Sequence, residues 1–240
     1  MKTLGVIPAR YGAQRFPGKP LALIAGKPLV QRVYEQARQA QRLDRVVVAT
    51  DDARIADAVK NFGGEVVLTA PTCPSGTDRA AEVARQIECD QIVNIQGDEP
   101  LMRPAMIDQL VEGLAGSDMA TLARPIESAE ALANPNIVKV VFAHNSNALY
   151  FSRHPIPFVR EGGAPVAHFK HLGIYAYQRD FLLKFVQLPP SDLEQAEKLE
   201  QLRALENGFT IKVLVTPYDS VGVDTPADVQ RVETILRNTK

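Results

Sequence analysis

The sequence has little of what marks a secreted, membrane-spanning or nucleic-acid-binding protein. It contains two cysteines, Cys73 and Cys89, whose spacing fits neither a metal-binding nor a redox motif, so we expect free thiols. The formal net charge of -1 excludes a general attraction to nucleic acid or to an anionic membrane. No apolar run approaches the roughly 20 residues of a membrane span, and the chain opens into a core-type strand rather than a signal peptide. We therefore expect a cytoplasmic protein, with no nucleic-acid or membrane partner, whose anion sites are local.

Strand-like apolar segments alternate with amphipathic helical segments along the first half of the chain. Strands are expected at 4–7, 44–50, 65–69 and 91–95, and helices at 28–42, 53–62 and 77–87. This alternation predicts an α/β fold: a Rossmann-like, mainly parallel sheet with helices on both faces. Ligands gather at the carboxyl ends of parallel strands, so we expect the loops at 8–20, 50–52 and 70–78 to share one rim.

The loop after the first strand, residues 8–20, is rich in positive charge and in proline. Its charged side chains are Arg10, Arg15 and Lys19. Gly12 and Gly18 let the backbone N–H groups approach an anion closely, and the prolines stiffen the loop. The spacing fits neither the P-loop nor the Rossmann glycine motif. We interpret the loop as a polyphosphate-binding site. The alternative is a solvated basic loop between a strand and a helix.

A second candidate site follows the strand at 91–95, in the sequence QGDEP (96–100). A carboxylate at Asp98 would face the basic loop across the rim of the sheet. Mg²⁺ prefers one or two protein carboxylates, with phosphate oxygens and water as its other ligands. The turn therefore predicts a magnesium site at Asp98, whereas Glu99 is expected to serve the turn. The alternative is an acidic turn that opens the helix expected at 104–116.

The loop at 70–78 precedes an apolar helix and contains small residues. Thr77 is expected to cap that helix. Ser75 and Gly76 lie just before it and present a surface small enough to admit a flat base.

The second half of the chain changes to closely spaced strands. Runs at 137–143 and 147–153 predict an antiparallel hairpin, followed by a loop at 153–163 that is too rich in proline and glycine for regular structure.

Two helix starts are marked near the end of the chain. Ser191 and Glu194 form a capping box that predicts one helix continuing to Leu202. Glu197 and Gln201 would then lie four apart on one face, for which solvent exposure is the alternative to binding. A last helix is predicted to begin at Pro226, and Asp224, which precedes its cap, is not needed for it.

A family resemblance emerges from these motifs together. Residues 7–21, IPARYGAQRFPGKPL, closely resemble the nucleotide-binding signature of sugar nucleotidyltransferases, and more narrowly that of the 3-deoxy-manno-octulosonate (Kdo) cytidylyltransferases. Further matches, which extend over nearly the whole chain, are SGTDR (75–79), QGDEP (96–100), HLGIY (171–175), LEQAEKLEQLR (193–203) and GVDTP (222–226).

The resemblance implies a role for each matched residue. The implied nucleotide-binding residues are Arg10, Arg15, Lys19, Ser75, Gly76 and Gln96. The implied ligands of Mg²⁺ are Asp98 and Asp224, which complete a catalytic set with Arg10 and Lys19. The implied acceptor-binding residues are Arg160, His171, Glu197 and Gln201. For Arg160 the alternative is simple exposure, and for His171 it is a hydrogen-bonded strand histidine.

The resemblance also implies an activity and an organisation. It implies transfer of CMP from CTP to Kdo with release of diphosphate, by a homodimer. Within a single domain, residues 1–125 and 208–240 would form the nucleotide-binding core, and 135–207 an antiparallel lobe for acceptor binding and dimerisation. The alternatives are a CMP-sialic acid synthetase, an enzyme for an amino variant of Kdo, and a non-catalytic nucleotide sensor.

Overall fold

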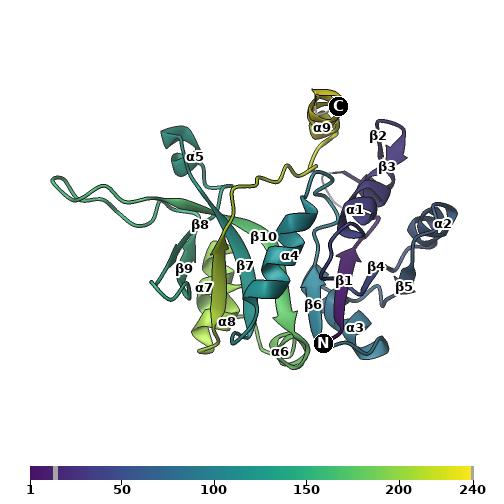
Figure 1. Ribbon diagram of the computed structural model, residues 1–240, viewed down its shortest axis with the longest axis horizontal. Helices are drawn as coiled ribbons and strands as arrows, with labels where there is room; N and C mark the ends of the chain where they lie inside the picture. The colour runs from purple at the N-terminus through teal and green to yellow at the C-terminus, as the bar shows by residue number, and fades with distance from the viewer. Residues whose placement is uncertain (13–15, 239–240) are drawn as a thin grey trace.

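The computed structural model describes residues 1–12 and 16–238, and in them a mixed sheet of nine strands forms the centre of the fold (Figure 1). The central strands run in the order β11-β7-β10-β6-β1-β4-β5, and β8 and β9 join the sheet beside β10. The strands are β1 (Thr3–Pro8), β4 (Arg45–Thr50), β5 (Val66–Leu68), β6 (Gln91–Asn94), β7 (Met119–Pro125), β8 (Lys139–Phe142), β9 (Ala148–Ser152), β10 (Phe169–Gln178) and β11 (Ile211–Val215). A separate pair, β2 (Leu23–Ile24) and β3 (Lys27–Pro28), is antiparallel.

The pairing confirms the expected mainly parallel sheet with an antiparallel addition. β1 is parallel to both β4 and β6, β4 is parallel to β5, and β7 is parallel to β11. β10 is antiparallel to β6 on one side and to β7 on the other. β8 and β9 form the predicted hairpin. β10 therefore brings a segment of the expected acceptor lobe into the middle of the sheet.

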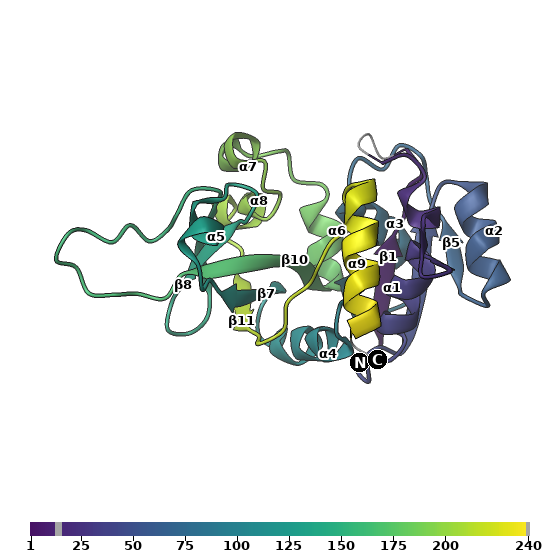
Figure 2. The same cartoon turned by 90° about the horizontal axis from the view of Figure 1, so that it is seen from above.

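Helices cover both faces of the sheet (Figure 2). Helices α1, α2, α4 and α9 pack on one face around Ile7 and Val48, while α3, α6 and α8 pack on the other around Val6 and Val47. These alternating residues of β1 and β4 are fully buried, as both faces of a parallel sheet require. The helices are α1 (Leu29–Ala37), α2 (Ala53–Asn61), α3 (Gly76–Gln86), α4 (Pro104–Gly113), α5 (Ala129–Ala133), α6 (Arg179–Phe185), α7 (Asp192–Glu197), α8 (Leu202–Glu206) and α9 (Pro226–Asn238).

Two expectations about helices were wrong. Ser75, not Thr77, is the N-cap of α3, and its hydroxyl oxygen accepts hydrogen bonds from the backbone N–H groups of Thr77 and Asp78. The capping box at Ser191 is present, but the helix that it starts ends at Glu197, because Lys198 adopts a left-handed conformation with φ of 53°. Glu197 and Gln201 are therefore not neighbours on one helical face.

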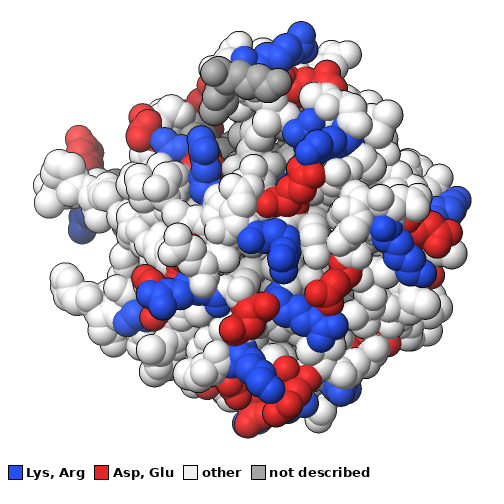
Figure 3. Space-filling model, turned by 45° about the vertical axis from the view of Figure 1, so that its right-hand side comes forward, with Lys and Arg blue, Asp and Glu red and all other residues white. Residues whose placement is uncertain are grey.

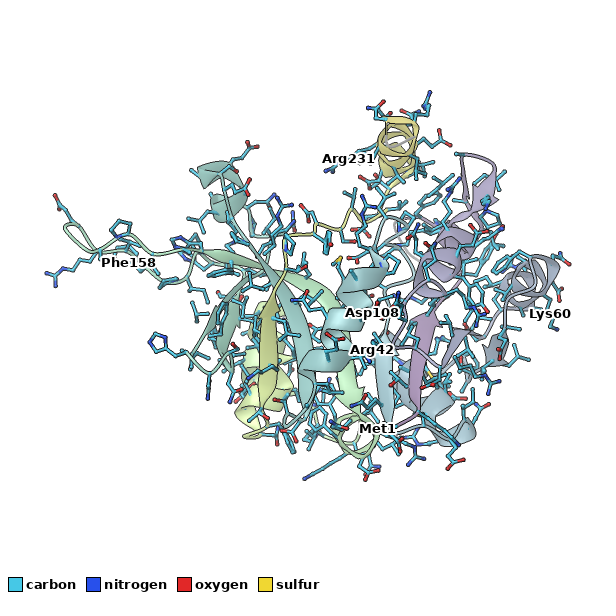
Figure 4. The ribbon with its side chains drawn as sticks, in the orientation of Figure 1. Met1, Arg42, Lys60, Asp108, Phe158 and Arg231 are labelled. Atoms are coloured by element: carbon cyan, nitrogen blue, oxygen red, sulfur yellow. The ribbon has the colours of Figure 1, made fainter. Side chains whose placement is uncertain are left out.

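The loop between β9 and β10 extends away from the body of the molecule (Figures 1 and 4). Phe158, labelled in Figure 4, lies on this arm and is 87% exposed. The expected irregular structure at 153–163 is confirmed. Cys73 and Cys89 are free thiols, as expected. In the described part of the chain, no helix combines the length and apolar character that a membrane crossing requires.

Candidate active site

The loops at the carboxyl ends of β1 and β6 border a cleft with a volume of about 670 Å³. Seven side chains or glycines expected from the sequence line it together: Arg10, Lys19, Ser75, Gly76, Gln96, Asp98 and Asp224. Arg15, the eighth residue expected at the nucleotide and metal, lies outside the described residues. Residues of the loops at 8–20 and 70–78 share the predicted rim. No residue of the loop at 50–52 lines the cleft, but Asp51 pairs with Arg79, which does.

Lys19 joins the two carboxylates that were expected to bind metal. Its Nζ lies 2.8 Å from Asp98 Oδ2 and 3.4 Å from Asp224 Oδ1. The lysine side chain is only 15% exposed, so these charge interactions are partly shielded from water. Asp98 and Asp224, far apart in the sequence, thus meet at a single ammonium group.

A short turn delivers Lys19 to this position. Gly18 has φ of 72°, the left-handed region that favours glycine, and its N–H donates to the Tyr11 carbonyl at 2.9 Å. Lys19 then begins a single 3-10 turn with Pro20. The local sequence therefore closes the basic loop on itself and aims its lysine into the cleft.

The turn that carries Asp98 lies directly against the end of β1. A Cβ on Gly97 would come within 2.5 Å of the Pro8 carbonyl oxygen, so only glycine fits there without displacement. The Ile95 N–H donates to the Val6 carbonyl at 2.8 Å and fixes the approach of the two segments. This close contact sets Asp98 beside the basic loop.

Asp98 and Asp224 could hold a divalent cation with help from a nucleotide. Among the described residues there is no cluster of three or more His, Cys, Asp or Glu side chains with metal-binding geometry. Two carboxylates are the number that Mg²⁺ commonly takes from a protein when phosphate oxygens and water supply the remaining ligands. The residues present therefore fit a metal that arrives with a polyphosphate rather than a site built from protein ligands alone.

A buried arginine lies in the cleft wall, just after the loop at 70–78. Arg79 is 3% exposed, and its guanidinium hydrogen-bonds Thr69 and pairs with Asp51 at 3.2 Å. The pair joins the buried Arg79 in the first turn of α3 to the partly exposed Asp51 just after β4. On the face shown in Figure 3, Lys and Arg side chains are interspersed with Asp and Glu, so positive charge is not gathered into a stripe there.

Glu200 connects the cleft to the segment between α7 and α8. The Ser75 hydroxyl donates to Glu200 Oε1 at 3.0 Å, and the Thr77 hydroxyl donates to Oε2 at 2.5 Å. Burial raises the pKa of Glu200, and these hydrogen bonds oppose that rise. The Glu200 carboxylate thus joins the segment between α7 and α8 to the end of the loop at 70–78.

The four residues expected to bind an acceptor do not line the cleft. Glu197 accepts hydrogen bonds from the Ser152 hydroxyl at 2.6 Å and from the Arg153 N–H at 2.9 Å, so it fastens α7 to the end of β9. Arg160 is exposed on the arm. Gln201 is 5% exposed, and its Nε2 has no hydrogen-bond partner within residues 1–12 and 16–238.

His171, the fourth, lies on β10 in largely aromatic surroundings. Its Nε2 is 3.0 Å from the Thr121 hydroxyl, and its ring contacts Phe151 edge-on and Tyr175. Burial lowers the pKa of His171 to about 3, so the imidazole is neutral at physiological pH. Gln96 links this strand to the cleft, because its Nε2 donates to the Gly173 carbonyl at 2.7 Å.

The sequence matches known proteins over most of its length. The family model described as cytidylyltransferase matches residues 4–213. The chain belongs to the cytidylyltransferase family. The 3-deoxy-manno-octulosonate cytidylyltransferases of Syntrophobacter fumaroxidans and Syntrophotalea carbinolica are 56% and 53% identical to it, over 98% and 99% of this chain and 97% and 99% of theirs.

Solved structures agree with this assignment. A CMP:2-keto-3-deoxy-manno-octonic acid synthetase, solved in complex with CTP, superimposes with a TM-score of 0.95 at 45% identity, with all of both chains covered. A cytidylyltransferase from Leptospira borgpetersenii, at 18% identity and a TM-score of 0.66 over 99% of this chain and 87% of its own, shares the fold.

Sequence reasoning missed Arg79, which lines the cleft, and Glu200, which accepts a hydrogen bond from Ser75 in the cleft wall. Arg79 ends the SGTDR match, and its position three residues into an apolar helix was the signal that it points inward. Glu200 immediately precedes Gln201 in the LEQLR match, but the assumption of one continuous helix directed attention to Glu197 instead. The break at Lys198 gives Glu200 a direction that helical periodicity could not predict.

Proposed function

We propose that this protein transfers CMP from CTP to Kdo, giving CMP-Kdo and diphosphate for lipopolysaccharide synthesis. The observation that carries the proposal is the cluster of Lys19, Asp98 and Asp224 in one cleft beside Ser75 and Gly76. A cation and two carboxylates fit the polyphosphate end of a nucleotide, and the small surface at 75–76 fits its base. The names of the relatives support Kdo as the acceptor.

The chemical difficulty of this reaction is charge, because an anionic sugar acid must approach an anionic nucleotide. Lys19 and Arg10 supply positive charge around the phosphates, where it stabilises the developing charge of the transition state and of the departing diphosphate. Asp98 and Asp224 would hold Mg²⁺, which when bound supplies further positive charge to the phosphate oxygens. Positioning and electrostatics therefore account for most of the catalysis, as in phosphoryl transfer generally.

The acceptor is proposed to enter from the side of β10. Gln96 joins the QGDEP turn to this strand, and the buried Nε2 of Gln201, which has no hydrogen-bond partner among the described residues, would donate to a sugar hydroxyl. We retain residues 135–207 as the acceptor-binding lobe and residues 1–125 and 208–240 as the nucleotide core, with Glu200 joining the two. His171, neutral in this environment, would act as a hydrogen-bonding group rather than as a cation.

The arm is proposed to form the interface of a homodimer. Phe158 is 87% exposed, Val159 41% and Val166 48%, and Leu149 on the adjoining hairpin is 62% exposed. Large apolar side chains gathered on a projecting segment are typical of surfaces that become covered by a partner.

We place the reaction in the cytoplasm, where CTP is available.

The test is diphosphate release from CTP with Mg²⁺, measured in parallel with Kdo, with N-acetylneuraminate and without an acceptor. Release with Kdo alone supports the donor, the reaction and the acceptor together. Release with the sialic acid alone would reject the Kdo assignment but keep cytidylyl transfer. No release with either sugar would contradict the proposed reaction. Size-exclusion chromatography with light scattering, on the wild type and on Phe158→Asp, tests the dimer.

A further inference from the structure

The second metal carboxylate is carried by a segment that has no helix or strand of its own. Residues 216–225, which we call the strap, connect β11 to α9 and run across the end of the sheet (Figures 1 and 2). Asp224 lies near its end. At its end the strap is held by α9, where the Asp228 carboxylate accepts hydrogen bonds from the Asp224 and Thr225 N–H groups. Between β11 and that point no helix or strand fixes the strap, so the approach of Asp224 to Asp98 also depends on the few side chains that fasten the strap to the body.

Asp219 is the first fastening. Its Oδ2 lies 2.9 Å from Arg124 Nη1 on β7, and its Oδ1 accepts a hydrogen bond from Lys170 Nζ on β10. The Ser220 N–H also donates to Asp219 Oδ1 at 2.8 Å. One carboxylate thus ties the strap to two neighbouring strands of the sheet.

Ser220 is the second fastening, and it reaches the turn that carries the other metal carboxylate. Its hydroxyl donates to Glu99 Oε2 at 2.8 Å, one residue beyond Asp98. Three residues further along the strap, the Val223 N–H donates to the Asp98 carbonyl at 2.9 Å, and the Val223 side chain is fully buried. The strap and the QGDEP turn are therefore joined at Asp98 and at the next residue, Glu99.

We infer that Asp219 and Ser220 are positioning residues that hold Asp224 against Asp98 and so set the affinity of the site for a divalent cation. Neither residue lines the cleft, so we expect neither to contact the nucleotide directly. Their effect passes through the strap to Asp224 and through Glu99 to Asp98. Partners that orient metal-binding carboxylates typically contribute about 10- to 100-fold in metal affinity. The inference rests on the proposed metal-dependent cytidylyl transfer.

The two partners of Asp219 lie side by side on the sheet. Lys170 directly precedes His171 on that strand, and Arg124 lies opposite Lys170 in the pairing of β7 with β10. Asp219 therefore fixes the strap, and with it Asp224, to β7 and β10, the strands from whose side we propose that the acceptor enters. Asp224 is positioned by this side of the sheet as well as by the nucleotide side.

The experiment compares Asp219→Asn and Ser220→Ala with the wild type. Ser117→Ala is the matched control, because Ser117 lies before β7, at the end of the sheet opposite the cleft. Mn²⁺ is titrated into the complex of each protein with CTP, with the protein in excess so that no free CTP competes for the metal, and is followed by electron paramagnetic resonance. CTP binding without metal is measured by calorimetry, and unfolding by urea. We expect the Kd for Mn²⁺ to rise about 10-fold or more in Asp219→Asn and at least about 3-fold in Ser220→Ala.

The accompanying measurements separate positioning from general damage. We expect the Kd for CTP without metal to stay within about 2-fold of the wild type, because neither side chain touches the cleft, and saturating Mg²⁺ to restore most of kcat. Unchanged Mn²⁺ affinity in both variants would overturn the inference, as would a loss of CTP affinity that matches the loss of Mn²⁺ affinity. A wild type that binds Mn²⁺ and CTP but releases no diphosphate with Kdo would instead reject the proposed function, and the ratio of metal affinities would still test the strap.

Discussion

Gly97 is the position where the smallest chemical change should most disturb the site. In Gly97→Ala the new methyl group would lie 2.5 Å from the Pro8 carbonyl oxygen, whereas real Cβ atoms do not approach closer than 3.0 Å. The turn or the end of β1 must therefore move by at least about half an ångström. The Ile95–Val6 hydrogen bond holds the strands together, so the displacement falls on the turn and on Asp98.

Two effects with different magnitudes follow from that displacement. Overpacking of this kind costs about 1–3 kcal/mol of unfolding free energy. Misplacement of a catalytic group by about 1 Å costs up to 10²-fold in rate, so we expect kcat/KM to fall about 10- to 100-fold. The assays are urea unfolding and diphosphate release from CTP with Mg²⁺ and Kdo.

Gly222→Ala is the matched control for this prediction. Its new methyl group would also lie beside the metal site, but it meets only the Asp98 carbonyl oxygen, at 4.0 Å. We expect its kcat/KM to stay within about 3-fold of the wild type, because 4.0 Å is an ordinary contact. Wild-type stability and activity in Gly97→Ala, or equal losses in the two variants, would refute the reasoning.

Three further predictions concern buried charge. His171 has a pKa lowered to about 3 by burial, so its stabilising contribution is complete above its unfolded pKa near 6.5 and is lost as pH falls toward 3. In urea unfolding, the stability of the wild type should therefore fall between pH 6 and 5 by up to about 1.4 kcal/mol more than that of His171→Gln, and parallel pH profiles would contradict this. Asp51→Asn should cost about 3 kcal/mol of unfolding free energy by leaving the buried Arg79 without its counter-charge, and adding Arg79→Met should recover part of the loss; no recovery would argue against the pair. Glu200→Gln should raise the Kd for CTP about 3- to 10-fold, measured by calorimetry, by weakening two hydrogen bonds to a charged group, while the Mg²⁺ dependence of the rate stays unchanged.

The features that could be predicted from the sequence were local. The valine-rich run at 44–50 and the apolar run at 4–7 were identified as buried strands, and β4 and β1 are paired in parallel. The hairpin of β8 and β9 and the helix start at Pro226 are likewise set by residues close together in the chain. Seven of the expected residues meet in the cleft, and all of them except Asp224 follow the strands expected at 4–7, 65–69 and 91–95, whose parallel arrangement was predicted correctly.

The features that could not be predicted depend on distant contacts or on a single backbone angle. No pattern in residues 169–178 specifies that β10 inserts between β6 and β7, because that position is chosen by packing across the whole sheet. The left-handed Lys198 contradicts the helical preference of its neighbours, and it places Glu200, rather than Glu197, at the loop that carries Ser75. The positions of Asp219 and Ser220 on the strap carry no motif at all.

The strap has a consequence for how the protein acquires its activity during synthesis. Every strand of the sheet, from β1 to β11, precedes Asp224 in the chain. The lysine and both carboxylates of the cluster are present together only in a stretch that includes residues 19–224. A nascent chain can therefore complete its sheet before the cluster of Lys19, Asp98 and Asp224 exists, so formation of the cluster reports the arrival of the last segment rather than collapse of the core. Contacts of such long sequence separation slow folding, and the order of the sequence itself makes the strap the last part of the cluster to be synthesised.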